Sequence, residues 1–136
     1  MRIFALLIMS LIGISAVSQN DSNTLTLNIK GLESSDGKIG LRLLNEKEEV
    51  VMRKMIDVTG TEMTAYFENI PSGTYAVNYY HDANDNGEID FKWYGAPDEG
   101  TGNSNDVKGV FGPPDFEKQL FELEGAMTMT MTTIYY

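Results

Sequence analysis

Residues 82–90 read D-A-N-D-N-G-E-I-D, a short segment crowded with oxygen-bearing side chains. Asp82, Asn84 and Asn86 stand at alternate positions, Gly87 follows them, and Asp90 ends the segment. Calcium takes six to eight hard oxygen ligands, and ligands at alternate positions let a chain curl around the ion while a glycine permits the sharp turn. The segment follows the pattern of a helix–loop–helix calcium loop from its first position to its ninth, and it therefore predicts a calcium site.

The remainder of that loop pattern is missing. Its twelfth position, where a bidentate glutamate should stand, holds Trp93, and no helical periodicity flanks the segment, so it is not an EF-hand. Further oxygens are expected from the backbone carbonyl of Glu88 and from water or the downstream residues Asp98, Glu99 and Asp106. Glu99 is the preferred one, because Pro97 and Gly100 bracket it in a turn. Magnesium suits such a ligand set less well, because it demands near-octahedral geometry. The predicted calcium ligands are Asp82, Asn84, Asn86, Glu88, Asp90 and Glu99.

A plain polar turn is the alternative interpretation of the same segment. Asn-Asp-Asn-Gly is a strong β-turn sequence, since asparagine, aspartate and glycine all tolerate a left-handed backbone. A simple hairpin does not need carboxylates at both Asp82 and Asp90 with amides at alternate positions between them. The spacing therefore favours the metal site over the turn.

Three aromatic residues follow the predicted calcium loop. Phe91, Trp93 and Tyr94 stand close enough together to form a surface on which a sugar ring could stack. This arrangement suggests a carbohydrate-binding module as an alternative function. Aromatic residues at this place could instead cap the core of the domain.

His81 is the only histidine of the chain, and it directly precedes the predicted loop. A hydrolase would need His81 and a carboxylate to converge on one pocket. The sequence marks no nucleophile with a matching acid, so a histidine that packs beside the loop and supports it is the better interpretation. We therefore predict no catalytic residue and a non-enzymatic protein.

The first eighteen residues have the composition of a secretory signal peptide. Arg2 supplies the positive end, residues 3–14 form an apolar run, and Ala16 and Ser18 give the small residues of a cleavage site. The run is too short to span a membrane as a helix, which needs about 20 apolar residues. We predict an exported protein, periplasmic or extracellular, with a signal peptide at 1–18, a single domain at 19–136, and no membrane span after cleavage.

The composition limits the possible partners. The formal net charge is −10, and removal of residues 1–18, which hold Arg2 and no acid, makes it −11. Such a surface repels phosphate backbones and anionic lipid heads, so nucleic acid and membrane surfaces are disfavoured, and a protein or glycan partner is expected. The chain contains no cysteine, which excludes disulfides and thiolate metal sites.

The elements expected to position the loop are short β-strands. Apolar and polar residues alternate in them, as in Leu25, Leu27 and Ile29 against Thr24, Thr26 and Asn28. We predict an all-β domain, an antiparallel β-sandwich of about seven strands of immunoglobulin-like or transthyretin-like type, with little or no helix and one long acidic loop. In the strand at 50–58 the phase is open, with either Val51 and Met55 or Val50 and Met52 inward. The expected strands lie within residues 24–31, 38–44, 50–58, 62–70, 74–81, 118–124 and 127–136.

The order of several motifs resembles a known family. The motifs are I-P-S-G-T-Y-A-V at 70–77, the loop segment at 81–90, G-A-P-D-E-G-T-G-N-S-N at 95–105 and P-P-D-F-E at 113–117. Together they resemble the bacterial domain of unknown function 2141 family over nearly all of residues 24–136. The resemblance implies an exported β-sandwich of the bacterial envelope, without an established activity.

Within that resemblance, the matching positions include the loop residues and a downstream segment. The aromatic pair Trp93-Tyr94 departs from the smaller, polar residues expected there. The strand entry P-S-G-T-Y-A-V is also similar to transthyretin-like and carboxypeptidase-regulatory modules, which are mostly non-catalytic. The positions that the resemblance carries are Asp82, Asn84, Asn86, Gly87, Asp90, Glu99, Gly102, Ser104 and Asn105.

Overall fold

The computed structural model describes residues 22–136. The predicted signal peptide at 1–18 lies outside the described residues. Within residues 22–136 no helix is long and apolar enough to cross a membrane.

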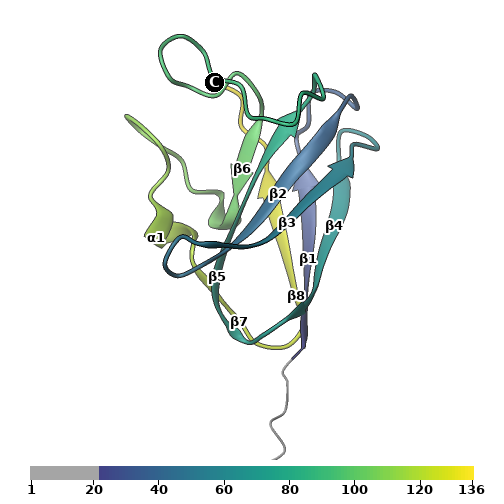
Figure 1. The fold of residues 1–136 in the computed structure, drawn as a ribbon, viewed down its shortest axis with the longest axis vertical. Helices are drawn as coiled ribbons and strands as arrows, with labels where there is room; N and C mark the ends of the chain where they lie inside the picture. Colours follow the sequence, from purple (N-terminus) through teal and green to yellow (C-terminus); the bar gives the residue numbers. More distant parts are fainter. Residues whose placement is uncertain (1–21) are drawn as a thin grey trace, which may run out of the picture.

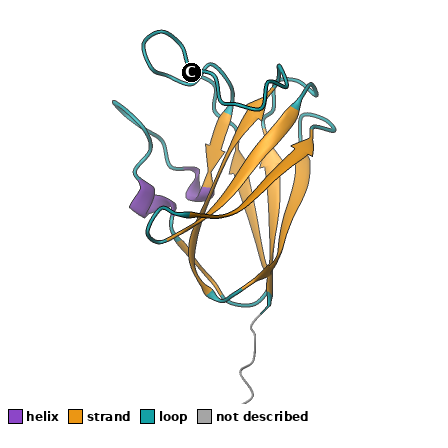
Figure 2. Ribbon diagram, in the orientation of Figure 1, coloured by secondary structure: helices purple, strands orange, loops and turns teal. Residues whose placement is uncertain are grey.

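The described chain is a β-sandwich with two very short helical segments (Figures 1 and 2). Its eight strands alternate apolar and polar residues along most of their lengths, which is the pattern of a half-buried sheet. The elements in chain order are β1 (Asn23–Lys30), β2 (Lys38–Asn45), β3 (Val50–Asp57), β4 (Met63–Ile70), β5 (Gly73–Asp82), β6 (Thr101–Asn103), η1 (Ser104–Asp106), α1 (Phe116–Gln119), β7 (Phe121–Leu123) and β8 (Met127–Thr132).

The strands form two sheets. One has the order β4-β1-β8, and the other has the order β3-β2-β5-β6, with β7 also paired to β5. The predicted all-β sandwich is confirmed, with one refinement: β8 runs parallel to β1, and every other pair is antiparallel. The backbone N–H of Gly125 donates to Asn23 Oδ1 at 2.7 Å, so the turn before β8 lies beside the start of β1 and both strands begin at the same end.

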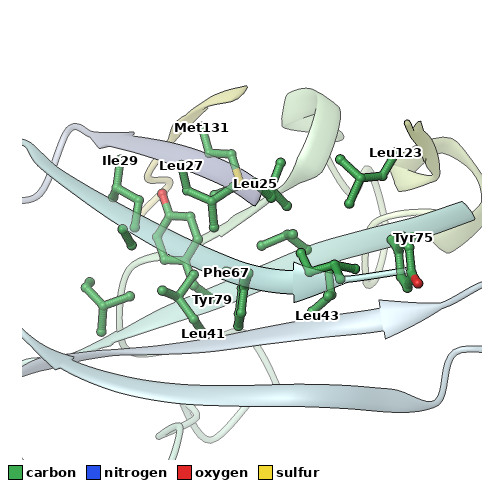
Figure 3. Close-up of a cluster of buried hydrophobic side chains, with 14 of the residues drawn as sticks. Leu25, Leu27, Ile29, Leu41, Leu43, Phe67, Tyr75, Tyr79, Leu123 and Met131 are labelled. Carbon is green, nitrogen blue, oxygen red and sulfur yellow. The ribbon is translucent and has the colours of Figure 1, made fainter. Parts of the chain in front are cut away.

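The core lies between the two sheets and is formed by the inward side chains of the alternating strands (Figure 3). The alternation predicted for β1 is confirmed, since Leu25, Leu27 and Ile29 are all fully buried. In β3 the phase is also settled: Val51 and Met55 are each 46% exposed, whereas Met52 and Ile56 pack against the core. The most deeply buried apolar residues include Leu25, Leu27, Ile29, Ile39, Leu41, Leu43, Phe67, Val77, Tyr79, Leu123 and Met131.

The long segment after β5 divides into two loops, because β6 pairs with β5 in its middle and η1 follows β6 directly. Ser104 fixes this division: it is fully buried, its hydroxyl accepts from Val77 N at 3.0 Å, and it donates to Gln119 O at 2.6 Å. We call residues 83–100 the acidic loop and residues 107–115 the second loop. Figure 1 shows both loops beside β6, at one edge of the larger sheet.

Candidate functional site

Asp82 ends β5 and is fully buried at the start of the acidic loop. Its Oδ1 accepts from Asn86 N at 3.0 Å, and its Oδ2 accepts from Gly87 N at 2.8 Å. Gly87 has a φ of +82°, a left-handed backbone that other residues adopt only with strain. The Asp82 carboxylate therefore draws the loop around itself through backbone N–H groups.

The Asp90 carboxylate accepts hydrogen bonds from both of the predicted amide ligands. Asn84 Nδ2 donates to Asp90 Oδ2 at 2.8 Å, and Asn86 Nδ2 donates to both carboxylate oxygens at 3.1 and 2.9 Å. The alternate spacing in the sequence thus brings these three side chains together. In this arrangement amide N–H groups, and not amide oxygens, face the Asp90 carboxylate.

Glu99 comes from the far end of the acidic loop and meets Asp90. Its side chain is only 8% exposed, and its Oε2 accepts from Asp90 N at 3.2 Å. Its Oε1 is buried and has no hydrogen-bond partner among the described residues. Burial raises the pKa of Glu99, the charges of Asp90 and Asp82 raise it further, and the backbone N–H groups of Asp90 and Ala83 offset part of this rise. The structure therefore places Glu99 against the segment at 82–90.

Glu88 is the predicted ligand that contributes no carboxylate to this cluster. Its side chain is exposed, and its backbone N–H donates to Asn86 Oδ1 at 3.0 Å. The prediction concerned its backbone carbonyl, and the exposed carboxylate is consistent with a role for the backbone alone.

The cluster of carboxylates lacks a basic partner. Asp82, Asp90 and Glu99 form no salt bridge among the described residues, since Lys38 instead contacts Asp85 at 2.8 Å and Asp57 at 3.9 Å. Buried carboxylates without a positive partner are unfavourable. No group of three or more His, Asp or Glu side chains within residues 22–136 is arranged to hold a metal ion. A cation here would therefore depend on amide and backbone oxygens as well.

Tyr80 anchors the acidic loop to the sheet, a contact that the sequence analysis missed. Its hydroxyl donates to Gly87 O at 3.1 Å. Its ring lies over Gly40 of β2, where an added Cβ would stand 2.4 Å from the ring. The glycine inside an otherwise regular strand was the available signal, because such a glycine often marks a close approach.

His81 is buried, with 2% of its surface exposed, and both ring nitrogens have partners. Nε2 donates to Asp36 O at 2.7 Å, and Nδ1 lies 3.0 Å from the Tyr135 hydroxyl. The Tyr135 oxygen in turn accepts from Glu33 N at 3.0 Å. This histidine ties β5 to two neighbouring segments, which matches the supporting role expected from the sequence.

The three aromatic residues of the acidic loop do not form one flat surface. Phe91, Trp93 and Tyr94 are 59%, 95% and 57% exposed, and the Trp93 and Tyr94 rings meet edge-on at 83°. Phe91 and Tyr94 line a pocket of about 630 Å³ over the outer face of the larger sheet, whereas Trp93 does not. The second loop forms another part of this pocket through Val110 and Phe111.

Comparison with known proteins identifies the family of the chain. No curated protein and no solved structure matches it. Residues 27–131 match the family described as "Uncharacterized protein conserved in bacteria (DUF2141)". This match covers the whole acidic loop and every strand, apart from the start of β1 and the end of β8. The chain is a member of this bacterial family, whose function is unknown.

Proposed function

We propose that the protein is an exported, non-catalytic β-sandwich module in which a calcium ion stabilises the acidic loop. The observation that carries this proposal is the buried Oε1 of Glu99, which has no hydrogen-bond partner among the described residues. A buried acceptor without a partner costs about 1–3 kcal/mol, and more when it is charged. A cation bound beside Glu99 would remove this cost.

The charges around Glu99 support a cation. Asp82 and Asp90 are close enough to raise the pKa of Glu99, and no lysine or arginine among the described residues forms a salt bridge with any of the three. Their mutual repulsion would be relieved by a divalent ion.

The chemistry of the available donors favours calcium over other ions. Carboxylates, the amide oxygens of Asn84 and Asn86, and the carbonyl of Glu88 are hard oxygen ligands, and the chain has no cysteine. Calcium accepts irregular sets of carboxylate, amide and backbone oxygens. The two amides donate their Nδ2 groups to Asp90 in this structure, so their oxygens would reach an ion only after the amides turn.

Export and lack of catalysis complete the proposal. The signal peptide predicted at 1–18 would place the protein in the periplasm or outside the cell, where calcium sites with a Kd of about 10⁻⁴–10⁻³ M are common. A catalytic histidine is not supported, because both nitrogens of His81 have partners in a buried position.

The direct test is thermal unfolding of the chain without its first eighteen residues, in chelator and in millimolar calcium. We expect calcium to raise the melting temperature clearly, and magnesium at equal ionic strength to raise it less. Asp90→Asn should abolish the calcium response. Glu88→Gln is the matched control, because it removes one negative charge from the same loop while leaving the backbone carbonyl. Equal shifts with calcium and magnesium in all three proteins would show that only charge screening is at work.

Carbohydrate binding is a second candidate function. It is favoured by the exposure of Phe91, Trp93 and Tyr94 and by the pocket that two of them line. Exposed aromatic rings beside a pocket present apolar faces of the kind on which sugar rings stack.

A further inference from the structure

A row of polar side chains crosses the outer face of the larger sheet. Arg53 of β3 lies opposite Arg42 of β2, Arg42 lies opposite Asn78 of β5, and Asn78 lies opposite Asn103 of β6. Their neighbours along the strands, such as Leu41 and Val77, point into the core, so the row faces outward.

The two arginines of this row are placed unfavourably for stability alone. Like charges directly opposite on adjacent strands destabilise a sheet. The chain carries a net charge of −10, yet neither Arg42 nor Arg53 forms a salt bridge with a carboxylate of the described residues. An arginine without a carboxylate partner is free to bind the anionic group of a ligand, and Arg42 is the one of the two that lines a pocket.

Arg42 is oriented for such an anion. Its Nε donates to Asn78 Oδ1 at 2.7 Å, which fixes the plane of the guanidinium group. Its two terminal nitrogens have no hydrogen-bond partner among the described residues. Partial burial and the charge of Arg53 lower the pKa of Arg42, and Tyr80 offsets part of this effect. The free end of a fixed guanidinium matches the two oxygens of a carboxylate.

The side chains around Arg42 indicate which other groups a ligand of this pocket would carry. Arg42 and Asn78 both line the pocket of about 630 Å³, together with Phe91 and Tyr94 of the acidic loop and Phe111 of the second loop. Glu48 is the one acidic residue among those lining the pocket. Phe111 is fully exposed, so its ring is available to a ligand. A suitable ligand therefore joins a carboxylate to a ring with an apolar face.

We propose that this pocket binds a carboxylate-bearing sugar, a hexuronate, with its carboxylate on Arg42 and its ring against the aromatic side chains. The apolar C–H face of a pyranose suits the rings of the two loops, and its hydroxyl groups suit the polar sheet face. This inference rests on the second candidate function, carbohydrate binding, and its argument uses none of the proposed calcium ligands.

The test is calorimetric titration of the chain without its first eighteen residues with digalacturonate and with the neutral disaccharide galactobiose. Both titrations are run in about physiological salt, with and without millimolar calcium, so that the state of the acidic loop does not decide the result. We expect saturable binding of digalacturonate and much weaker binding of galactobiose. Arg42→Gln should weaken digalacturonate binding about 10- to 100-fold, the usual effect of losing a charged hydrogen-bond pair.

Two further variants distinguish a loss of binding from a loss of folding. Arg53→Gln removes the same charge from a residue outside the pocket lining and should weaken binding far less than Arg42→Gln. Phe111→Ala changes a fully exposed side chain and should weaken binding without altering the melting temperature. Equal losses in the two arginine variants would overturn the role of Arg42.

The remaining outcomes separate the inference from the function on which it rests. Galactobiose binding as tightly as digalacturonate would overturn the carboxylate inference and leave carbohydrate binding standing. Binding of neither disaccharide would overturn both.

Discussion

The substitution Glu99→Gln should change stability in opposite directions with and without calcium. In chelator, it removes a buried carboxylate whose Oε1 has no hydrogen-bond partner among the described residues. The glutamine can keep an oxygen on the Asp90 N–H, and it carries no charge for Asp82 and Asp90 to repel. We therefore expect the variant to be more stable than the parent protein when no calcium is present.

The expected size of each effect follows from the contacts of Glu99. Removing an unpartnered buried charge should raise the free energy of unfolding in chelator by about 1–3 kcal/mol. In calcium at about 1,000 times the Kd, the parent protein gains about 4.1 kcal/mol that the variant cannot gain. For a domain of this size, each kcal/mol shifts the melting temperature by about 4 °C. The two melting curves should therefore change order on addition of calcium.

The assay is a pair of thermal or denaturant unfolding curves for each protein, in chelator and in excess calcium. Glu88→Gln is again the control, because Glu88 is exposed and its carboxylate makes no contact with the cluster. If Glu99→Gln lowers stability equally in both buffers, Glu99 serves only to accept from the Asp90 N–H. That result would refute the reasoning from the unpartnered Oε1.

The difference in stability between Glu99→Gln and the parent protein should also depend on pH, and the raised pKa of Glu99 determines its direction. Burial raises the pKa of Glu99 above its ordinary value of 4.5, so the folded state binds this proton more tightly than the unfolded state. The cost of the charged carboxylate is present in full above the folded pKa, and it disappears as the pH falls through that pKa toward 4.5. In chelator, the advantage of Glu99→Gln should shrink over this interval, whereas the curve of Glu88→Gln should follow that of the parent protein.

Two further predictions concern the packing that supports the site. Gly40→Ala places a Cβ 2.4 Å from the Tyr80 ring and should lower the free energy of unfolding by about 1–3 kcal/mol, whereas Gly60→Ala, whose Cβ would lie 3.7 Å from the nearest atom, should change it little. Met131→Ala removes a fully buried side chain and should cost about 2–5 kcal/mol in urea unfolding, against a smaller loss for Met129→Ala, which is only partly buried. A change in the Gly60 variant as large as in the Gly40 variant would show that the Tyr80 contact is not the cause.

The sequence alone predicted the parts of the fold that depend on local periodicity. Leu25, Leu27 and Ile29 alternate with polar residues, so their burial follows from the period of a strand. The phase of β3 stayed open because apolar side chains occupy both of its faces, with Val51 and Met55 exposed and Met52 packed on the core. Neighbouring strands, and not the residues of β3 itself, decide which face is buried.

Features that depend on contacts between distant segments were not predictable in this way. The parallel pairing of β8 with β1 depends on where the turn at Gly125 meets Asn23, and local periodicity carries no information about it. Glu99 was predicted to fold back toward the loop because Pro97 and Gly100 bracket it in a turn, and its carboxylate accepts from Asp90 N. The row that joins Arg42 and Asn78 was not, because its register is set by three separate strand pairs.

The acidic loop links the two proposed sites. One side of it gathers buried carboxylates around Asp82, and the other side carries Phe91 and Tyr94 to the pocket over the sheet. Tyr80 lines the same pocket and holds the loop through its hydroxyl bond to Gly87 O. The positions of these aromatic side chains therefore depend on the conformation of the acidic loop. A bound cation would complete the loop and fix the aromatic side of the pocket, so the metal site would act as support for the binding surface and not as a reactive centre.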